Sequence, residues 1–311
     1  KTVNNKLYKL NMSDIGHNNP PLDPKEAIER NINRKKSILD REPQIYKDIP
    51  LPSWIELSLI DVCNRDCSFC PKSDSSIAPN TYNKMEFTLI DKMIEDLQEI
   101  NFDGSFTFCG YGEPLLHPHI AQITKKIGEF WSVEIVTNGD PLNKKNLREL
   151  YYSKVSKIVV SMYDGFEQIE KFEKIIREAD VPRDFVILRD RWITGDEFSE
   201  YITNRAGTVK SGNQTKVEDL KDKKCFYPAY HTQIDWNGDI FLCPHDWQRR
   251  NPMGNLMQKK FFEIWTGSLM IKYRKMLFSG KREAPPCSSC NCHGKVHGSK
   301  HHLAWEKSNK L

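Results

Sequence analysis

Three cysteines lie in one short segment of the chain, at Cys63, Cys67 and Cys70. Thiolates are soft ligands that suit an iron–sulfur cluster or zinc. A structural zinc site takes four ligands and typically uses paired Cys-x2-Cys knuckles, whereas this segment offers three. Three ligands leave one coordination position open, where a small molecule can bind the metal directly. We therefore favour a reactive iron–sulfur cluster, with a zinc site or a plain electron-transfer cluster as the alternative.

The remaining cysteines are spread over the rest of the chain, at Cys109, Cys225, Cys243, Cys287, Cys290 and Cys292. The total of nine is odd, and the polar first fifteen residues lack the apolar run of a secretory signal. Both features argue against a disulfide framework. We expect reduced thiols in the cytoplasm, and reduced cysteines in tight groups usually bind metal.

Strand and helix patterns alternate between residues 53 and 190. Strands are predicted at 54–60, 105–109, 133–137, 157–161 and 185–188, with helices at 85–100, 119–130, 144–152 and 166–178. This rhythm is typical of parallel strands joined by crossover helices, in which the chemistry gathers at the carboxyl ends of the strands. Cys63 follows the first strand, Gly112-Glu113-Pro114 the second, Asn138 the third, and Ser161 ends the fourth.

The Cys63-x3-Cys67-x2-Cys70 loop after the first strand resembles the signature of the radical S-adenosylmethionine superfamily, and Phe69 fits the aromatic residue that usually precedes its last cysteine. The resemblance implies a [4Fe–4S] cluster whose open iron chelates the amino and carboxylate groups of S-adenosylmethionine. It also implies cleavage of this cofactor to a 5′-deoxyadenosyl radical, which abstracts hydrogen from a substrate. A reducing partner such as flavodoxin or ferredoxin would supply the electron.

Residues at the ends of the next strands resemble cofactor contacts of the same superfamily. Gly112-Glu113-Pro114 looks like part of the GGEP motif, with Tyr111 in place of its first glycine. Glu113 is the acceptor expected for the ammonium group. Thr137, Asn138 and Ser161 resemble positions that contact the ribose and the methionine carboxylate. The alternative is that Gly-Glu-Pro and Thr-Asn-Gly are ordinary turns.

The later cysteines resemble the SPASM/twitch extensions of this superfamily, which carry auxiliary [4Fe–4S] clusters. The resemblance implies one cluster around a predicted hairpin at 234–240, held by Cys225, Cys243, Cys287 and Cys290. Because Cys292 alone is left beyond these four, we favour the shorter twitch arrangement with a single auxiliary cluster. The alternatives are a four-cysteine zinc knuckle and a ligand set in which Cys292 displaces one of the four.

Three further residues are candidates for catalysis. Cys109 and Cys292 carry thiols that could quench a substrate radical, as a cysteine does in radical epimerases of the superfamily; the alternative is a small buried apolar role. Arg205 lies in a stretch similar to one near the substrate of several SPASM/twitch enzymes, and its guanidinium suits a carboxylate, phosphate or polyol. The alternative for Arg205 is a surface loop. Surface or turn positions are expected for the histidines, namely His231, His245 and those of residues 293–302.

Composition and charge exclude several classes of protein. Hydrophobic residues make up 38% of the chain, enough for a sizeable core. The net charge is +4, and the basic residues are scattered without the stripe and interleaved aromatic residues of a nucleic-acid-binding surface. There is no run of eighteen apolar residues, so we expect no membrane span.

The predicted fold class is α/β. Residues 1–52 are expected to form an N-terminal extension, 53–207 a partial (β/α)6 TIM-like barrel, and 208–311 a small iron–sulfur twitch/SPASM-like domain with a C-terminal tail. The resemblance implies an enzyme that oxidises or epimerises a polar small molecule, similar to aminocyclitol dehydrogenases and sugar epimerases. Modification of a ribosomal peptide and a non-catalytic iron–sulfur or zinc protein are the alternatives.

Overall fold

The computed structural model describes residues 24–191, 203–209 and 220–311. The largest element is an eight-stranded sheet in the order β10-β9-β8-β3-β4-β5-β6-β7. Its strands are β3 (Trp54–Leu57), β4 (Ser105–Phe108), β5 (Ser132–Thr137), β6 (Lys157–Met162), β7 (Val186–Asp190), β8 (His231–Ile234), β9 (Asp239–Phe241) and β10 (Gly254–Asn255). A separate hairpin pairs β1 (Ile45–Tyr46) with β2 (Ile49–Pro50).

Six neighbouring strands of the large sheet are parallel. Strands β3 to β7 pair in chain order, and β8 pairs with the other edge of β3, with His231 opposite Trp54. β9 and β10 extend this edge in antiparallel fashion. The predicted α/β fold with a parallel sheet is thereby confirmed. Among the described residues the sixth parallel strand is β8, which leads into the predicted hairpin.

The hairpin therefore continues the sheet of the preceding segment. The division of the chain at residues 52 and 207 stays a prediction, because the segment after 207 contributes β8 to β10 to the same sheet as β3 to β7.

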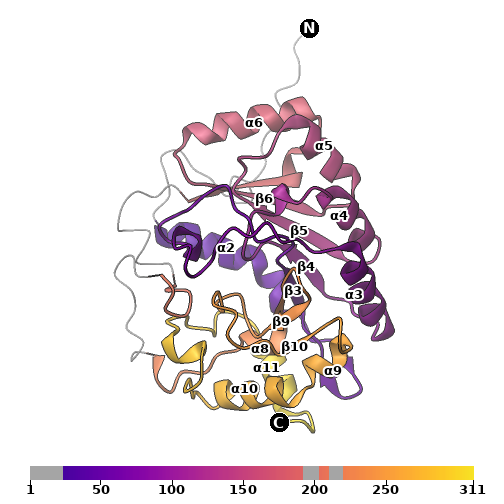
Figure 1. Ribbon diagram of the computed structural model, residues 1–311, viewed down its shortest axis with the longest axis vertical. Coiled ribbons are helices and arrows are strands. Elements are labelled where there is room, and N and C mark those ends of the chain that lie inside the picture. The colour runs from indigo at the N-terminus through magenta and orange to yellow at the C-terminus, as the bar shows by residue number, and fades with distance from the viewer. Residues whose placement is uncertain (1–23, 192–202, 210–219) are drawn as a thin grey trace.

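Helices α3 to α6 cover one face of the sheet (Figure 1). They are α3 (Phe87–Glu99), α4 (Ile120–Gly128), α5 (Lys144–Tyr152) and α6 (Glu167–Ala179). In α3 the buried residues Ile90, Met93 and Leu97 recur at helical spacing, which gives the helix one apolar side. The strand residues that face these helices are fully buried and apolar, among them Ile55, Phe106, Ile135 and Ile158.

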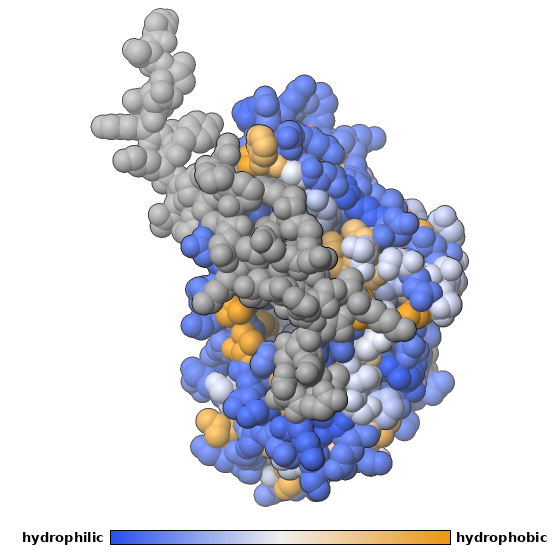
Figure 2. Space-filling model, turned by 90° about the vertical axis from the view of Figure 1, so that its left-hand side faces the viewer, coloured by the Kyte–Doolittle hydropathy of each residue, from blue (hydrophilic) through white to orange (hydrophobic). Residues whose placement is uncertain are grey.

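The remaining helices of the C-terminal part gather at the β8 to β10 end of the sheet (Figure 1). They are α8 (Tyr227–Tyr230), α9 (Phe261–Trp265), α10 (Ser268–Phe278) and α11 (Ser299–Glu306), and four 3-10 turns lie at Pro71–Ser73, Pro114–Leu116, Arg183–Phe185 and Cys287–Ser289. None of the described helices is long and apolar enough to cross a membrane. Figure 2 shows a mostly hydrophilic surface with small separate apolar patches.

Helix α2 (Pro24–Leu39) lies against the opposite face of the sheet from α3 to α6 (Figure 1). Arg34 on α2 pairs with Glu134 on β5, and the Lys35 ammonium stands 5.0 Å from the ring centre of Trp54 on β3. A parallel sheet normally carries apolar residues on both faces. Here this inner face carries polar side chains at alternate positions, namely Glu56, Thr107, Glu134, Ser161, Arg189 and His231. The inner face is therefore the part of the sheet equipped for chemistry.

The expectation that the histidines occupy surface or turn positions is wrong for five of them. His231, His245, His297, His301 and His302 are buried, with exposures of 0 to 8%. The reason is tertiary: α11 contacts α8 and β2, and its Trp305, fully buried, donates to the backbone oxygen of Ala229. The C-terminal helix thus closes the end of the molecule over side chains that a local pattern assigns to loops.

Candidate active site

The three-cysteine loop connects β3 to α3, and its backbone is folded around the thiols. The N–H of Cys70 donates to the oxygen of Cys67 at 2.8 Å, and the N–H of Arg65 lies 3.4 Å from the sulfur of Cys63. Lys72 donates to the backbone oxygens of Asp61 and Pro79 and so joins the two ends of the loop. All three thiols are half-buried, and burial raises their pKa values, that of Cys67 to about 11. Three soft donors with an N–H directed at sulfur fit the predicted cluster.

The Gly112-Glu113-Pro114 motif lies directly against this loop. The N–H of Glu113 donates to the oxygen of Val62 at 2.9 Å, and a Cβ at Gly112 would fall 2.2 Å from the oxygen of Ile60, so this approach requires glycine. The Glu113 carboxylate is 3% exposed. Burial raises the pKa of this carboxyl group to about 7, because its effect exceeds that of the hydrogen bonds, which lower the pKa.

The Glu113 carboxylate ties the end of β4 to the end of β5. It accepts hydrogen bonds from Thr137 Oγ1 at 2.6 Å, from the Asn138 N–H at 2.8 Å and from the Leu115 N–H at 3.0 Å. Glu113 was expected to accept from the ammonium of the cofactor. The structure places it among protein donors, one layer behind the cysteine loop. Its contact with the cofactor stays a prediction.

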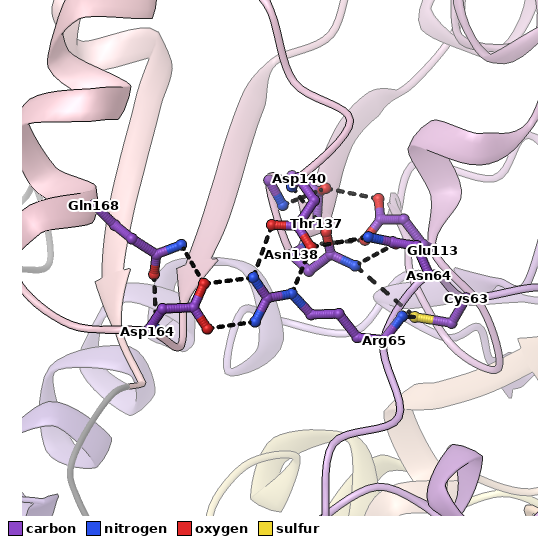
Figure 3. A network of polar contacts seen from close by, with 10 residues as sticks. Cys63, Asn64, Arg65, Glu113, Thr137, Asn138, Asp140, Asp164 and Gln168 are labelled. Atoms are coloured by element: carbon purple, nitrogen blue, oxygen red, sulfur yellow. Dashed lines mark hydrogen bonds and ion pairs between the residues drawn. The ribbon is translucent and has the colours of Figure 1, made fainter.

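Arg65 links the cysteine loop to the ends of two strands (Figure 3). Its guanidinium bonds both oxygens of Asp140, after β5, and both oxygens of Asp164, after β6, at 2.6 to 2.7 Å. Asn138 adds a second link, because its amide nitrogen lies 2.8 Å from Asn64 Oδ1 and 3.8 Å from the Cys63 sulfur. The sequence reasoning missed Arg65, although a fork-shaped cation between two cysteines is a usable signal.

Tyr111, which replaces the first glycine of the motif, has a packing role. Its ring is fully buried in a small cluster with Ala78, Phe241 and Trp247, and its hydroxyl donates to the oxygen of Asp246 at 3.0 Å. The glycine-only backbone conformation falls on Gly110, with φ +97°, so position 111 tolerates a side chain. Because the ring and the hydroxyl of Tyr111 are engaged within the protein, a ligand could contact this residue only through its backbone.

Phe69 and Ser161 lie on the side of the loop nearer the inner face of the sheet. The Phe69 ring stands 5.4 Å from that of Tyr163, and Ser161 Oγ accepts from Arg189 Nη2 at 2.6 Å. Thr137 and Asn138 therefore meet the cysteine loop, whereas Ser161 belongs to the polar inner face. Their roles toward the cofactor remain predictions.

The later cysteines converge on a second site. Cys225, Cys243, Cys287, Cys290 and Cys292 line one cavity of about 20 Å³, and the first four are buried. Burial raises the pKa of each thiol, that of Cys225 to about 11. A Cβ at Gly294 would lie 2.4 Å from the Cys225 sulfur, so a side chain there would clash with it. The backbone nitrogen of Cys292 lies 3.3 Å from the sulfur of Cys290. Thiols, a glycine cradle and an N–H directed at sulfur suit a cluster.

Arg282 joins the two segments that carry these cysteines. It donates to the backbone oxygens of Lys223, Cys292 and His293. Among the described residues no three Cys, His, Asp or Glu side chains are spaced as ligands of a single metal ion.

A cavity of about 260 Å³ lies between α2, the inner face of the sheet and the second cysteine site. Asn31, Lys35, Trp54, Glu56, Arg205 and His231 are among the residues that line it. It shares Tyr227, His245 and Cys292 with the cavity of the five cysteines. The second cysteine site therefore borders the inner cavity.

Two of the predicted catalytic residues line this cavity, and the third lies next to it. Arg205 begins a run of three residues with left-handed backbone, with φ 48°, 54° and 85° at 205 to 207. Its Nε is buried and has no hydrogen-bond partner in the described structure. Cys292 faces both cavities. Cys109 follows β4 with its sulfur 3.9 Å from Thr107 Oγ1, and Glu56 and Lys35 both affect its pKa, which burial raises well above the usual value.

The sequence did not predict the cavity residues Lys35, Glu56 and His231, or Arg189 behind the cavity wall. Glu56 and Arg189 interrupt apolar strands at alternate positions, which is a signal of a polar inner face. Lys35 carries no such signal, because α2 is a mostly polar helix and its position against the sheet is set by tertiary contacts.

A three-cysteine loop at the carboxyl end of a parallel sheet, a second cysteine site and a polar cavity that borders the second site define a cluster-dependent enzyme. The sequence comparisons identify the family. Residues 57–186 match the model of the radical SAM superfamily, and residues 225–291 match that of the SPASM iron–sulfur cluster-binding domain. The chain belongs to the radical S-adenosylmethionine superfamily, with a SPASM-type domain, and its cofactors are S-adenosylmethionine and [4Fe–4S] clusters, as predicted.

Named relatives agree with this assignment. The chain is 27% identical over 245 residues to an S-adenosyl-L-methionine-dependent 2-deoxy-scyllo-inosamine dehydrogenase of Niallia circulans, covering 77% of this chain and 92% of the relative. It is 30% identical over 130 residues to a GTP 3′,8-cyclase of Microcystis aeruginosa, covering 40% and 37%. A crystal structure of BtrN with AdoMet and 2-DOIA superposes with a TM-score of 0.66 at 26% identity, covering 78% of this chain and 94% of BtrN. The prediction of a radical S-adenosylmethionine enzyme is confirmed, and a non-catalytic scaffold is not supported.

Proposed function

We propose that this enzyme oxidises a secondary alcohol of a cyclic polyol to a ketone, with the loss of two protons and two electrons. The observation that carries the proposal is the shared lining of the two cavities, because Tyr227, His245 and Cys292 border both the inner cavity and the cysteine site. A substrate in the inner cavity would lie next to an electron acceptor held by the later cysteines. The Niallia circulans relative is named as a dehydrogenase of an aminocyclitol, which supports this class of substrate.

Oxidation of an alcohol to a ketone removes one hydrogen atom from carbon, one proton from oxygen and one electron. When bound, S-adenosylmethionine and the two clusters supply the radical that takes the hydrogen atom and the acceptor that takes the electron. Cys63, Cys67 and Cys70 would hold the first cluster, and Cys225, Cys243, Cys287 and Cys290 the second. The chain itself must accept the proton and orient the polyol.

Glu56 is the group best placed to accept the proton. Its Oε2 lies 3.6 Å from His231 Nε2 in the cavity wall. Burial acts to raise the pKa of Glu56, but His231 outweighs it and brings the pKa below the usual value. Glu56 is therefore a carboxylate at neutral pH, and its His231 neighbour would stabilise the charge until the hydroxyl proton arrives at the carboxylate oxygen.

A second candidate function is epimerisation, which the thiols at the cavity favour. Cys292 lines the cavity, and Cys109 lies beside Glu56 and Lys35. A thiol that returned a hydrogen atom to the opposite face of the carbon would invert it without net oxidation.

Product analysis separates the two functions. The reconstituted, reduced enzyme is incubated anaerobically with S-adenosylmethionine and a panel of cyclic polyols, aminocyclitols and sugars, in water and in heavy water. Oxidation predicts a product two hydrogens lighter and one 5′-deoxyadenosine per product. A product of unchanged composition that gains one deuterium in heavy water would establish epimerisation instead, and a modified peptide as the one accepted substrate would overturn both.

A further inference from the structure

The inner cavity is lined by two half-buried cations that form no ion pair among the described residues. They are Lys35 and Arg205. Glu134, the carboxylate nearest to Lys35 on the sheet, is already paired with Arg34. Glu56 faces His231 at 3.6 Å. Glu134 and Glu56 thus already face Arg34 and His231, whereas Lys35, which lies over the Trp54 ring, and Arg205 have no carboxylate partner among the described residues.

Arg189 extends this positive region behind the cavity wall. Its Nη1 lies 3.4 Å from Oδ1 of Asn31, a cavity residue, and its Nε is buried without a hydrogen-bond partner within the described part of the chain. Burial lowers its pKa. Burial and the neighbouring charges of Arg189 and Arg205 lower the pKa of Arg191 to about 9. Several cations therefore lie near one another at this side of the cavity and repel one another.

Charges that are taken out of water without a partner are costly, and a ligand of opposite charge would offset that cost. The cavity of about 260 Å³ is large enough for a substituted monosaccharide or cyclitol ring. Guanidinium and ammonium groups are the usual partners of carboxylate and phosphate oxygens.

We propose that the substrate is a polyol bearing an anionic group, a carboxylate or a phosphate, and that Lys35 and Arg205 bind that group, with Arg189 reinforcing the field. The proposal rests on the proposed function for the location of the substrate and names its class more closely. It departs from the relative's aminocyclitol, whose amine would meet cations. Lys35 belongs to α2, which lies outside both segments matched by the family models, so this specificity belongs to the chain's own N-terminal helix.

The test is a binding measurement on the reconstituted full-length enzyme with S-adenosylmethionine bound, by anaerobic calorimetry. The probes are glucuronate and glucose 6-phosphate for the two anions, glucose for the neutral ring and glucosamine for the amine. We expect one of the two anionic sugars to bind about ten- to a hundredfold more tightly than glucose, the range of one charge-assisted contact. Which of them does so distinguishes a carboxylate from a phosphate ligand.

Two variants assign the effect. Lys35→Gln and Arg205→Gln should each remove about tenfold or more of the preference for the anionic sugar while glucose affinity stays constant, and Arg205→Lys should restore part of it. Lys36→Gln is the matched control, because Lys36 is the next residue of α2 and is exposed. Iron content and thermal unfolding show that each variant folds.

Three outcomes would overturn the proposal. Glucose or glucosamine binding as tightly as both anionic sugars would show that the cavity does not select an anion. Unchanged selectivity in both glutamine variants would show that Lys35 and Arg205 do not bind the anionic group. Weakened binding of S-adenosylmethionine itself in Lys35→Gln would assign the cation to the cofactor. Failure of the proposed oxidation is visible separately, as tight anion binding without a product two hydrogens lighter.

Discussion

Glu113 shows how a residue recognised by its motif can act through its neighbours. Its carboxylate accepts from Thr137 Oγ1 and from the N–H groups of Leu115 and Asn138, and Asn138 in turn contacts the Cys63 sulfur. We therefore treat Glu113 as the residue that fixes the ends of β4 and β5 against the cysteine loop. The cofactor-binding backbone depends on that position.

A Glu113→Gln variant tests this role. The amide keeps the shape but places a donor against one of the protein donors, so we expect S-adenosylmethionine to bind about tenfold more weakly with the iron content unchanged. Calorimetry and iron analysis measure the two quantities. Cofactor affinity equal to that of the wild type would show that the hydrogen bonds accepted by the Glu113 carboxylate are not needed for cofactor binding.

Glu56 carries the proton-accepting role in the proposed oxidation. In Glu56→Gln the carboxylate is lost, and we expect formation of the ketone to slow by about a hundredfold or more, the usual contribution of a general base. Cleavage of S-adenosylmethionine to 5′-deoxyadenosine should continue, uncoupled from product. A rate of ketone formation within a factor of two of the wild type would assign the proton to another group.

At the scale of elements, the sequence predicts well what depends on local pattern. The strands β3 to β7, the helices α3 to α6 and the hairpin at Asn237-Gly238 lie within a few residues of their predicted bounds, because apolar periodicity and turn residues determine them. The helix predicted at 144–152 matches α5 residue for residue. The positions of the cysteines after β3 and around the hairpin follow from the same pattern.

The local sequence pattern does not predict how the helices and strands pack against one another. α2 is a polar helix whose partners, Glu134 and Trp54, lie far away in the sequence. The parallel pairing of β8 with β3 joins residues about 177 positions apart in sequence, as the bond from Ser53 to the oxygen of Tyr230 shows. These contacts create the inner cavity, so Lys35 and His231 could not be assigned to it from the sequence.

Helix α11 gives a prediction about stability and pH. His301 on this helix is fully buried, neither ring nitrogen has a hydrogen-bond partner in the described structure, and burial lowers its pKa from 6.5 to about 4. Arg41, Asp40, Glu42 and Asp103 supply the surrounding charges. Between pH 6.5 and 4 the unfolded chain binds a proton that the folded chain excludes, so this residue makes stability fall as the pH falls, by about 3 kcal/mol in all.

Urea unfolding at pH 7.5 and pH 5 measures this contribution. In His301→Leu the loss of unfolding free energy between the two pH values should be smaller than in the wild type by about 1 to 2 kcal/mol. His293→Leu is the control, because His293 is exposed on the same C-terminal segment. An equal pH dependence in wild type and His301→Leu would contradict the assignment.

At the scale of the whole molecule, one sheet supports both cysteine sites. β3 ends at the loop of Cys63, Cys67 and Cys70, and its neighbour β8 begins the hairpin that leads to Cys243. The inner cavity lies along β3 and β8, with α2 on one side and the second cysteine site on the other. In the proposed function, a polar substrate in this cavity would lie next to the group that completes the oxidation.

The central claim is that the two cysteine groups hold two separate [4Fe–4S] clusters, and iron and sulfide per chain after anaerobic reconstitution test it most directly. The comparison is between the wild type and the Cys63→Ala, Cys67→Ala, Cys70→Ala triple variant. The account predicts about eight irons per chain in the wild type and about four in the variant. About four in the wild type and none in the variant would contradict it, because the later cysteines would then hold no cluster and the proposed oxidation would lose its electron acceptor.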